Sequence, residues 1–266
     1  MSDQSVVAAR FDTSVAHPAR MYDYFLGGKD NFPADRAAAD RLLAAAPQTR
    51  VGARENRAFL QRAIRYLAGE ASIRQFLDIG TGLPTQGNVH EIAQQVVPDA
   101  RVVYVDNDPI VHVHANALLA GDNTTAILAD LREPEAILGA PQVRGMIDFD
   151  EPLAVLLVAV LHFIRDEEDP AGIVAQLRDA IAPGSYLVLS HGTGDLDLEL
   201  SAEATRVYER AAAPLVLRSL AEIARLFDGF ELVDPGLVQL SLWRPDGELP
   251  SARGLFGGVG RKPRQR

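Results

Sequence analysis

A carboxylate and two closely spaced glycines stand together at Asp78-Ile79-Gly80-Thr81-Gly82, directly after a short apolar run. Because glycine has no side chain, this segment can turn sharply and approach a ligand closely. The neighbouring carboxylate repels a pyrophosphate but suits a cationic group. Taken alone, the spacing is also typical of a tight turn that binds nothing, so the residues after the following strands decide its meaning.

Polar residues follow the next two apolar runs in the same way. Asp106 and Asn107 come after the second run, where a carboxylate can accept hydrogen bonds from a ribose diol. Asp130 comes after the third run and can accept from an adenine amino group, while the Leu131 amide can donate to a ring nitrogen. A single strand-end Asp is more often a helix N-cap. Because parallel strands present their carboxyl ends at one edge, the ordered series predicts a site for an adenosine-containing ligand.

Three histidines and two tyrosines are candidate proton acceptors, with His17 and Tyr24 in the N-terminal segment beside the three that we expect to be catalytic. His162 follows the fourth apolar run, His191 follows the fifth, and Tyr22 comes from the N-terminal part of the chain. A histidine can take up a proton near neutral pH. His162, His191 and, from the N-terminal segment, Tyr22 are therefore the candidate catalytic residues. The alternatives are a packing role beside the ligand for His162 and a hydrogen-bonded loop position for His191.

The strands and helices that position these groups can be predicted from the sequence pattern. From about residue 71 onward, apolar runs alternate with helical patterns. Such an alternation is typical of a parallel α/β sheet with crossover helices. We expect strands near residues 75–79, 101–105, 124–128, 153–159 and 185–190, and helices near residues 87–97, 109–120 and 169–182. The apolar runs at 229–233 and 237–243 flank Asp234-Pro235-Gly236 and predict a terminal antiparallel hairpin.

The chain divides by composition into three parts. Residues 1–70 are rich in alanine and arginine and predict an N-terminal helical lid or cap. Residues 71–245 form the expected ligand-binding domain, and residues 246–266 are expected to be a C-terminal tail with a solvated basic end.

The segment 20–32 has an unusual composition within this cap. It contains four of the 17 aromatic residues of the chain, interrupted by Gly-Gly-Lys-Asp-Asn, and looks like a loop that presents stacking and polar groups. We expect Tyr22, Tyr24, Lys29 and Asn31 to face the bound ligand as part of a lid. The alternative is an aromatic cluster that docks the N-terminal helices.

Composition excludes several classes of function. The chain of 266 residues has no cysteine, so disulfides, zinc–thiolate sites, iron–sulfur clusters and cysteine nucleophiles are excluded. Its net charge of −10 disfavours nucleic acid as a partner. The longest apolar run has nine residues, about half of a spanning helix. Residues 1–4 lack the features of a signal peptide, so a cytoplasmic location is expected. No strand-end carboxylate cluster suits a hard cation, and no metal is expected.

Four segments together carry a resemblance to a known family. Asp-x-Gly-x-Gly with a later strand-end Asp resembles the class I S-adenosylmethionine-dependent methyltransferases, whereas a dinucleotide fingerprint requires a third glycine where Thr85 stands. Residues 20–32, 78–84, 156–162 and 183–191 resemble the bacterial S-adenosyl methyltransferase family formerly catalogued as a domain of unknown function. The resemblance covers nearly the whole chain. It implies a Rossmann-like sheet and S-adenosyl-L-methionine as cofactor, and it is silent on the acceptor.

The sequence thus predicts a methyltransferase that acts on a small-molecule acceptor. Cytosine C5 chemistry is excluded because it needs a cysteine, and the Pro-Pro-aromatic loop of amino-directed DNA enzymes is absent at residues 160–163. Two alternatives remain open at this point: a non-catalytic module that binds S-adenosylmethionine, and a nicotinamide-dependent oxidoreductase.

Overall fold

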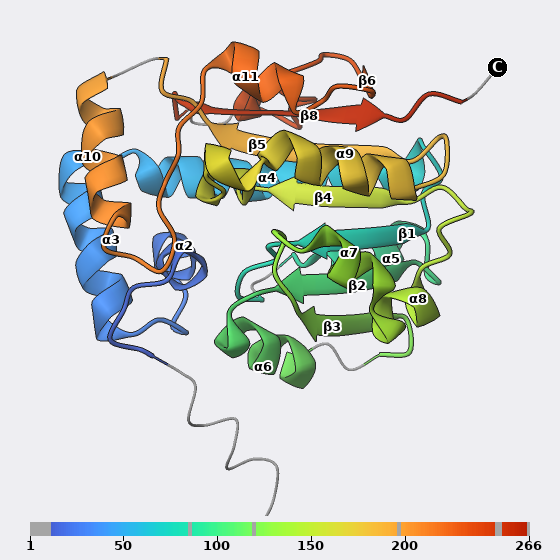
Figure 1. Ribbon diagram of the computed structural model, residues 1–266, viewed down its shortest axis with the longest axis horizontal. Helices are drawn as coiled ribbons and strands as arrows, with labels where there is room; N and C mark the ends of the chain where they lie inside the picture. The colour runs from blue at the N-terminus through green and yellow to red at the C-terminus, as the bar shows by residue number, and fades with distance from the viewer. Residues whose placement is uncertain (1–11, 85–86, 119–120, 196–197, 248–251, 265–266) are drawn as a thin grey trace, which may run out of the picture.

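The centre of the molecule is a mixed sheet whose parallel strands end along one edge (Figure 1). The computed structural model describes residues 12–84, 87–118, 121–195, 198–247 and 252–264. The strand order is β3-β2-β1-β4-β5-β8-β6, and β7 pairs with β8. The strands are β1 Gln75–Ile79, β2 Arg101–Asp106, β3 Thr124–Leu128, β4 Ala154–Val158, β5 Tyr186–Gly192, β6 Glu231–Leu232, β7 Val238–Gln239 and β8 Leu255–Arg261.

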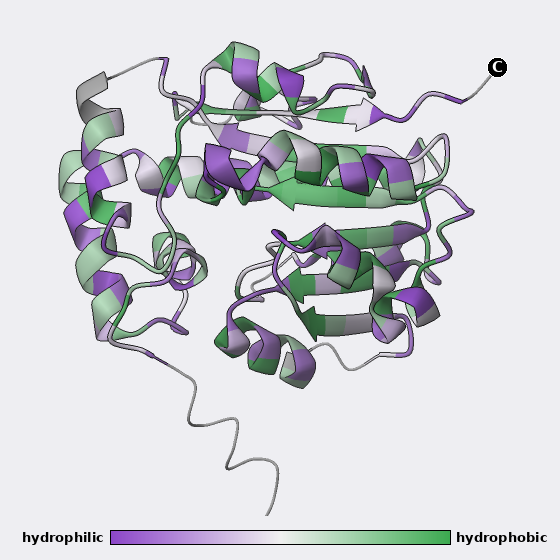
Figure 2. Ribbon diagram, viewed as in Figure 1, coloured by the Kyte–Doolittle hydropathy of each residue, from purple (hydrophilic) through white to green (hydrophobic). Residues whose placement is uncertain are grey.

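The first five strands run parallel, as the sequence predicts, and β8 runs antiparallel to β5. The predicted α/β fold class, a mostly parallel Rossmann-like sheet with a terminal antiparallel part, is therefore confirmed. Figure 2 shows that the strands at the centre of the sheet are predominantly hydrophobic, as expected for strands that are covered on both faces.

Helices cover both faces of the sheet. The helices of the sheet domain are α5 Val89–Val96, α6 Pro109–Leu118, α7 Pro134–Gly139, α8 Pro141–Met146, α9 Pro170–Ala180 and α11 Leu220–Arg225. Successive strand side chains point to opposite faces. Leu77 and Ile79 therefore belong to a core with α7, α9 and α11, whereas Phe76 belongs to a second core with α5 and the long helix α4.

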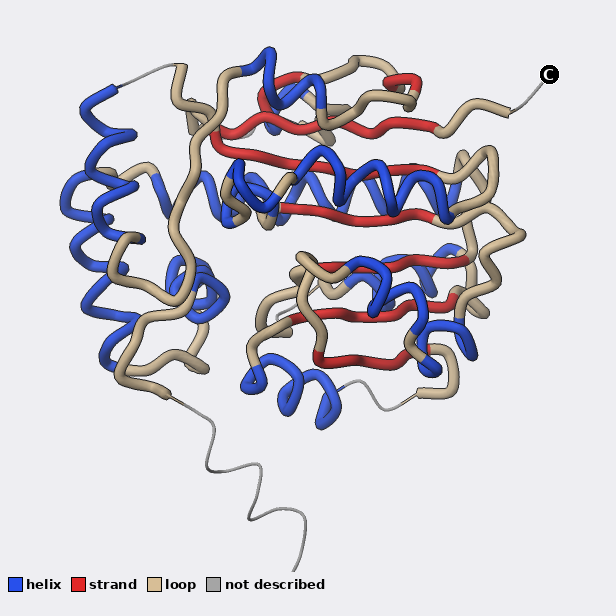
Figure 3. The backbone as a smooth tube through the Cα atoms, viewed as in Figure 1, coloured by secondary structure: helices blue, strands red, loops and turns tan. Residues whose placement is uncertain are grey.

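The N-terminal helices form a cap at the edge to which the parallel strands point (Figure 1). They are α2 Pro18–Leu26, α3 Pro33–Ala45 and α4 Thr49–Gly69, and α10 Leu198–Tyr208 joins them. A separate apolar cluster holds α2, α3 and α10 together. Helix α4 begins in this cap and continues along the sheet, so it connects the two parts (Figure 3).

The segment 20–32 is not the predicted loop along its whole length, because its first part belongs to α2. Pro18 occupies the first helical position, and His17 caps the helix by accepting a hydrogen bond from the Ala19 amide. Gly27 ends the helix in the left-handed conformation with φ of 84°. Proline at the start and glycine just after the end are the ordinary signals of a helix, and the aromatic content of the segment obscured them.

The C-terminal elements differ from the predicted hairpin and tail. β6 and β7 each have two residues, and both pair with β8 rather than with each other. β8 lies inside the predicted tail, between β5 and β6 in the sheet. Three glycines weaken its strand signal, but the fold requires small residues there: a Cβ on Gly257 would lie 2.8 Å from the Leu189 carbonyl oxygen. Part of the predicted tail, residues 248–251 and 265–266, lies outside the described residues, as do Thr85 and residues 1–4.

Candidate functional site

A cavity of about 680 Å³ lies between the carboxyl ends of the parallel strands and the cap. Its lining includes all of the strand-end residues predicted to bind the cofactor: Asp78, Gly80, Thr81, Gly82, Asp106, Asn107, Asp130 and Leu131. It also includes Tyr22 and His162. The side chains that the sequence placed after separate strands are thus brought to one site by the parallel sheet.

The turn after β1 brings the backbone close to the neighbouring strands. Gly80 and Gly82 adopt φ values of 75° and 67°, a region that favours glycine. A Cβ on Gly80 would lie 2.4 Å from a methyl carbon of Val160, whereas a Cβ on Gly82 would meet no atom within 4 Å. Gly80 is therefore required by packing after β4, and Gly82 leaves open space at the cavity. Thr81 holds the turn by donating its hydroxyl to the Asp78 carbonyl oxygen at 3.0 Å.

Asp106 is fixed at the end of β2 by two backbone donors. Its two carboxylate oxygens accept hydrogen bonds from the amides of Gly82 and Asp108, at 2.8 and 2.9 Å. Burial raises the pKa of Asp106 to about 6. Because each oxygen can accept a second hydrogen bond, the carboxylate retains acceptor capacity toward the cavity.

Asp130 lies after β3 within a network of donors. Its carboxylate accepts from the Asn107 amide at 2.9 Å and from the guanidinium of Arg132 at 3.0 Å. Despite partial burial, the hydrogen bond from the Arg132 backbone amide, followed by those from the Asn107 side chain and the Arg132 guanidinium, holds the pKa of Asp130 below its usual value. Among the described residues, none accepts a hydrogen bond from the Leu131 amide, which therefore remains a donor for a ligand.

Asp78 is a buried carboxylate with little compensation. Only 5% of the residue is exposed, and burial raises its pKa to about 7, while the Arg57 guanidinium acts in the opposite direction. No hydrogen bond to its carboxylate is found within the described part of the chain. Burying a carboxylate without a partner is unfavourable, so this end of the cavity favours a cationic ligand group.

Arg57 is a cavity residue that the sequence reasoning missed. It comes from α4 and lines the cavity together with Asp78. One of its terminal nitrogens donates to Asn88 at 3.3 Å, and its buried Nε has no partner within the described residues. No local pattern distinguishes it from the other arginines of α4, because only the docking of the helix decides which of them faces the strands.

The two candidate catalytic histidines have different surroundings. The Nδ1 atom of His162 accepts a hydrogen bond from the Gly192 amide at 3.3 Å, so the ring proton is on Nε2. Burial, together with the charges of His191 and Arg218, lowers the pKa of His162 well below its usual value. His162 is therefore a neutral hydrogen-bond donor at the cavity. The predicted role as a proton acceptor does not fit this tautomer.

His191 does not line the cavity. Its Nδ1 donates to the Gly192 carbonyl oxygen at 2.7 Å, and its Nε2 accepts from Arg218 at 2.9 Å. Burial lowers its pKa to about 4. Arg218 also donates to the carbonyl oxygen of Ile164 at 2.8 Å, so it joins β5 to the turn after β4. The predicted catalytic role of His191 does not fit this geometry, whereas the alternative of a hydrogen-bonded histidine does.

Tyr22 connects the cap to the sheet. Its hydroxyl donates to the Ala53 carbonyl oxygen at 2.9 Å and accepts from Asn56 at 3.0 Å. Asn56 accepts from the Ser190 hydroxyl at 2.6 Å, and this hydroxyl accepts from the Ala159 amide at 2.9 Å. Ala159 has a φ of 57°, unusual for a residue with a Cβ. Burial raises the pKa of Tyr22, so Tyr22 is suited to positioning rather than to accepting a proton.

Tyr24, Lys29 and Asn31 are not part of the cavity lining. The Tyr24 hydroxyl donates to Asp40 of α3 at 2.9 Å, and the buried Asn31 amide donates to Asp23 at 2.8 Å. The expectation that these three residues face the ligand does not fit the structure. Within segment 20–32, the helical part with Tyr22 and Phe25 reaches the cavity instead.

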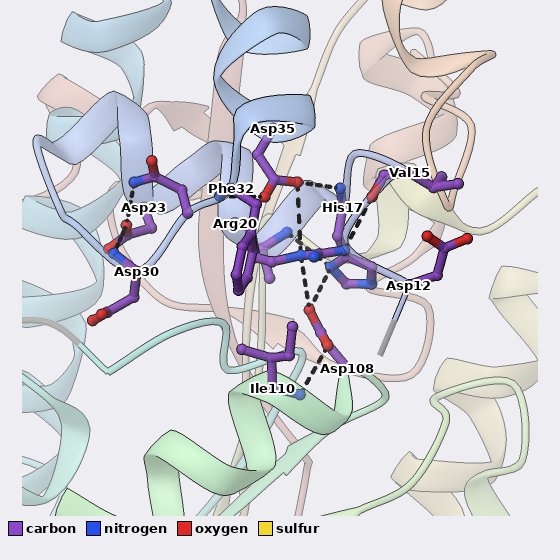
Figure 4. A network of polar contacts seen from close by, with 12 residues as sticks. Asp12, Val15, His17, Arg20, Asp23, Asp30, Phe32, Asp35, Asp108 and Ile110 are labelled. Carbon is purple, nitrogen blue, oxygen red and sulfur yellow. Dashed lines mark hydrogen bonds and ion pairs between the residues drawn. The ribbon is translucent and has the colours of Figure 1, made fainter. Parts of the chain in front are cut away.

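A cluster of buried charges joins the cap to the loop after β2 (Figure 4). We call it the Arg20 cluster: His17, Arg20, Asp35 and Asp108. The Nε atom of Arg20 lies 3.6 Å from the Asp35 carboxylate and 3.3 Å from the Asp108 carboxylate. His17 lies 3.3 Å from the same oxygen of Asp108. Because the Asp108 amide donates to the Asp106 carboxylate, the cluster connects the start of α2 to the end of β2.

Comparison with known families identifies the family to which this chain belongs. A family model described as S-adenosyl methyltransferase matches residues 4–263. The chain belongs to the S-adenosyl methyltransferase family. The resemblance seen in the sequence is therefore confirmed, and so is S-adenosyl-L-methionine as the cofactor of this methyltransferase. The nicotinamide-dependent alternative is excluded by the same match.

The S-adenosyl methyltransferase is similar to solved structures. A Thermobifida fusca YX protein assigned to the methyltransferases has 46% identity and a TM-score of 0.91, with coverage of 95% of this chain and 97% of that one. A DUF574 family protein from Streptomyces avermitilis MA-4680 has 45% identity and a TM-score of 0.92, with coverage of 96% and 100%. The N-methyltransferase NodS from Bradyrhizobium japonicum WM9, in complex with S-adenosyl-L-homocysteine, shares the fold at 15% identity and a TM-score of 0.51, with coverage of 92% and 100%. No curated protein matches the chain.

The donor and acceptor groups of this methyltransferase fit S-adenosyl-L-methionine. The cavity combines an uncompensated buried carboxylate, a buried guanidinium nitrogen without a partner and a carboxylate with spare acceptor capacity. In the described ranges, no three His, Asp or Glu side chains gather in a way that could hold a metal ion. None of the helices described combines the length and apolar character needed to cross a membrane.

Proposed function

We propose that this methyltransferase binds S-adenosyl-L-methionine along the strand ends and transfers its methyl group to a small molecule under the cap. The observation that supports this proposal is that one cavity includes both the polar strand ends and an apolar region formed by α2, α3 and α10. Bound S-adenosyl-L-methionine supplies a methyl group that is already activated on a sulfonium. The protein then has to bind the cofactor and the acceptor, orient them toward each other and exclude water from the site.

The adenosine end is assigned to the residues after β2 and β3. Asp106 accepts hydrogen bonds from the ribose hydroxyls, because its oxygens keep free acceptor positions in the cavity. The Leu131 amide donates to an adenine ring nitrogen. Asn107 orients Asp130 through their hydrogen bond, and Asp130 accepts from the adenine amino group in this proposal.

The amino-acid end is assigned to Asp78 and Arg57. The Asp78 carboxylate faces a cationic group, and the α-ammonium of the cofactor supplies one. Arg57 donates to the α-carboxylate, for which its planar guanidinium is suited. Gly82, where a Cβ would meet no protein atom within 4 Å, leaves open the close approach that both contacts need.

The cap positions the acceptor and excludes water. Tyr22 and Asn56 fix the cap to the ends of β4 and β5 through Ser190. His162 offers an N–H to the cavity and orients the acceptor by donating a hydrogen bond. No described side chain is placed here as a base, so the nucleophile is a group that carries an available lone pair when bound.

Calorimetry on the full chain tests the proposal. S-adenosylmethionine and S-adenosylhomocysteine are expected to bind, with NAD at least about tenfold weaker. Arg57→Met removes hydrogen bonds to a charged group, which contribute about 1.5–3 kcal/mol, so the affinity for S-adenosylhomocysteine is expected to fall about 10–150-fold. The matched control is Arg54→Met, an exposed position on the same helix. Equal affinities of the two variants would remove Arg57 from the site.

Turnover is measured by transfer of a labelled methyl group to extracted small molecules. Labelled product in the small-molecule fraction supports the proposed reaction. Tight cofactor binding without transfer to any fraction would instead favour a non-catalytic binding module.

A further inference from the structure

One part of the cavity under the cap is lined by apolar side chains. We call it the acceptor pocket and define it by Phe25, Leu42, Phe163, Ala204, Tyr208 and Leu215. All six line the cavity, and all six belong to or pack against the apolar cluster of the cap. They come from α2, α3, the turn after β4, α10 and the segment after α10. Their side chains therefore create a continuous apolar wall.

Charged side chains of the cavity lie elsewhere. Among the described lining residues, α2, α3 and α10 contribute none. The charged lining residues that the structure describes are Asp78 in β1, Asp106 at the end of β2, Asp130 after β3 with its partner Arg132, Arg57 of α4 and Arg253 before β8. Transfer of an unpaired charge into an apolar site is strongly unfavourable. The acceptor pocket therefore selects against a ligand that carries a charge in its buried part.

Two aromatic rings define the shape of the acceptor pocket. The ring centroids of Phe163 and Tyr208 are 5.3 Å apart, with an interplanar angle of 50°. His162 lies next to them, with its ring centroid 4.5 Å from that of Phe163. Aromatic walls favour a ring as the ligand, because offset and edge contacts add to the burial of area.

The Tyr208 hydroxyl is the polar group of this wall. Tyr208 is 7% exposed, and burial raises the pKa of its hydroxyl above the ordinary value, with no hydrogen bond contributing. Within the described residues, this hydroxyl has no protein partner. Because this hydroxyl can both donate and accept a hydrogen bond, a ligand with a polar atom at that point is favoured over a pure hydrocarbon.

We propose that the methyl acceptor is an uncharged, ring-containing small molecule whose ring lies against Phe163 and Tyr208 and whose polar atom pairs with the Tyr208 hydroxyl. This inference rests on the proposed function, because it concerns the second ligand of the same cavity. It narrows the acceptor to a neutral aromatic or heteroaromatic class and excludes phosphorylated and carboxylated acceptors whose charge would lie under the cap.

The test uses three probes that share a naphthalene ring and differ in charge: 2-naphthol, 2-naphthoate and 2-naphthylmethylammonium. Each is titrated by calorimetry into the full chain saturated with S-adenosylhomocysteine. We expect 2-naphthol to bind at least about tenfold more tightly than either charged probe. Equal or tighter binding of a charged probe, or no binding of 2-naphthol, overturns the proposal.

Two variants, each with a matched control, test whether the probes bind in the acceptor pocket. Tyr208→Phe is expected to weaken 2-naphthol about fivefold, the effect of one hydrogen bond of about 1 kcal/mol, and to leave naphthalene unchanged. Tyr66→Phe, outside the cavity, is the matched control. Ala204→Asp is expected to reverse the preference toward 2-naphthylmethylammonium, whereas Ala202→Asp on the exposed face of α10 is not. Unchanged selectivity in Ala204→Asp would refute the assigned location.

The affinity for S-adenosylhomocysteine is measured for every variant and separates this inference from the proposed function. Absence of S-adenosylhomocysteine binding in the wild type contradicts the proposed function itself. Normal binding of S-adenosylhomocysteine without the expected probe selectivity contradicts only the acceptor class. Thermal unfolding of each variant shows that a lost preference comes from the pocket and not from a misfolded cap.

Discussion

The buried carboxylate of Asp78 makes a pH-dependent cofactor affinity the sharpest prediction. Burial raises the pKa of Asp78 to about 7, so the carboxylate is about nine-tenths ionised at pH 8 and about one-tenth ionised at pH 6. Only the ionised form attracts the α-ammonium of the cofactor. The affinity for S-adenosylhomocysteine is therefore expected to fall about tenfold between pH 8 and pH 6 through Asp78.

A second ligand distinguishes this effect from other titrations. 5′-Methylthioadenosine has the adenosine part but lacks the amino-acid part. Its affinity depends on Asp106, whose pKa of about 6 leaves the carboxylate about half ionised at pH 6. We expect its affinity to change by no more than about threefold over the same range. Calorimetry at pH 6, 7 and 8 measures both ligands.

Ionisation of Asp78 is expected to favour cofactor binding but to lower the free energy of unfolding. The folded-state pKa of about 7 lies above the reference value of 3.8. The folded chain therefore holds the proton more tightly, and this contribution to stability is lost as the pH rises from about 4 to 7. Asp78→Asn removes the ionisable group, so it is expected to raise the free energy of unfolding at pH 8 by up to about 4 kcal/mol.

Urea unfolding and calorimetry on Asp78→Asn complete the test. The variant is expected to be more stable than the wild type at pH 8 and to bind S-adenosylhomocysteine more weakly. Between pH 8 and pH 6 its affinity is expected to keep only the change of about threefold or less that comes from Asp106. The reasoning is refuted by a wild-type affinity that does not change with pH. It is also refuted by an equal change for 5′-methylthioadenosine, or by a variant that is less stable at pH 8.

Further predictions concern the ribose site, the cap and the β1 turn. Asp106→Asn is expected to weaken S-adenosylhomocysteine and 5′-methylthioadenosine alike, about 10-fold or more by calorimetry; unchanged dissociation constants would remove Asp106 from the ribose site. Arg20→Met removes the guanidinium next to two buried carboxylates and is expected to cost about 3–5 kcal/mol in urea unfolding, whereas exposed Arg41→Met on α3 is a control with little effect. Gly80→Ala meets Val160 at a positive φ and is expected to cost about 2–4 kcal/mol; a stability equal to wild type would contradict the packing argument. A chelator is expected to leave cofactor affinity unaltered, and a loss restored by magnesium would show a metal site.

The amino-acid sequence by itself was sufficient for the parallel sheet and for the polar residues at its edge. The signal for each strand is local, an apolar β-branched run. When such runs alternate with helical patterns, few folds other than a parallel α/β sheet fit the sequence. Each polar group then follows from its place after a strand, since parallel strands end at one edge. Asp78, Asp106 and Asp130 could therefore be assigned to one cavity before any contact was known.

Elements with weak or conflicting local signals needed the tertiary structure. β8 has three glycines and no strand-like composition, but it pairs with β5 over seven residues because only small residues fit between its neighbours. The helix α2 was obscured by its aromatic residues, which pack into the cap. In both cases, packing against distant segments overrides local propensity.

The residues that complete the site were decided by tertiary structure alone. Arg57 and Tyr208 come from helices α4 and α10, and nothing in their sequence neighbourhood separates them from exposed residues of the same type. His191 lies at the end of β5, as other predicted site residues lie at or near the ends of their strands, yet Arg218, 27 residues away, occupies its Nε2 atom. The physical reason is that a strand determines where its end lies in a parallel sheet, whereas the face that a helix buries depends on which surface it docks against.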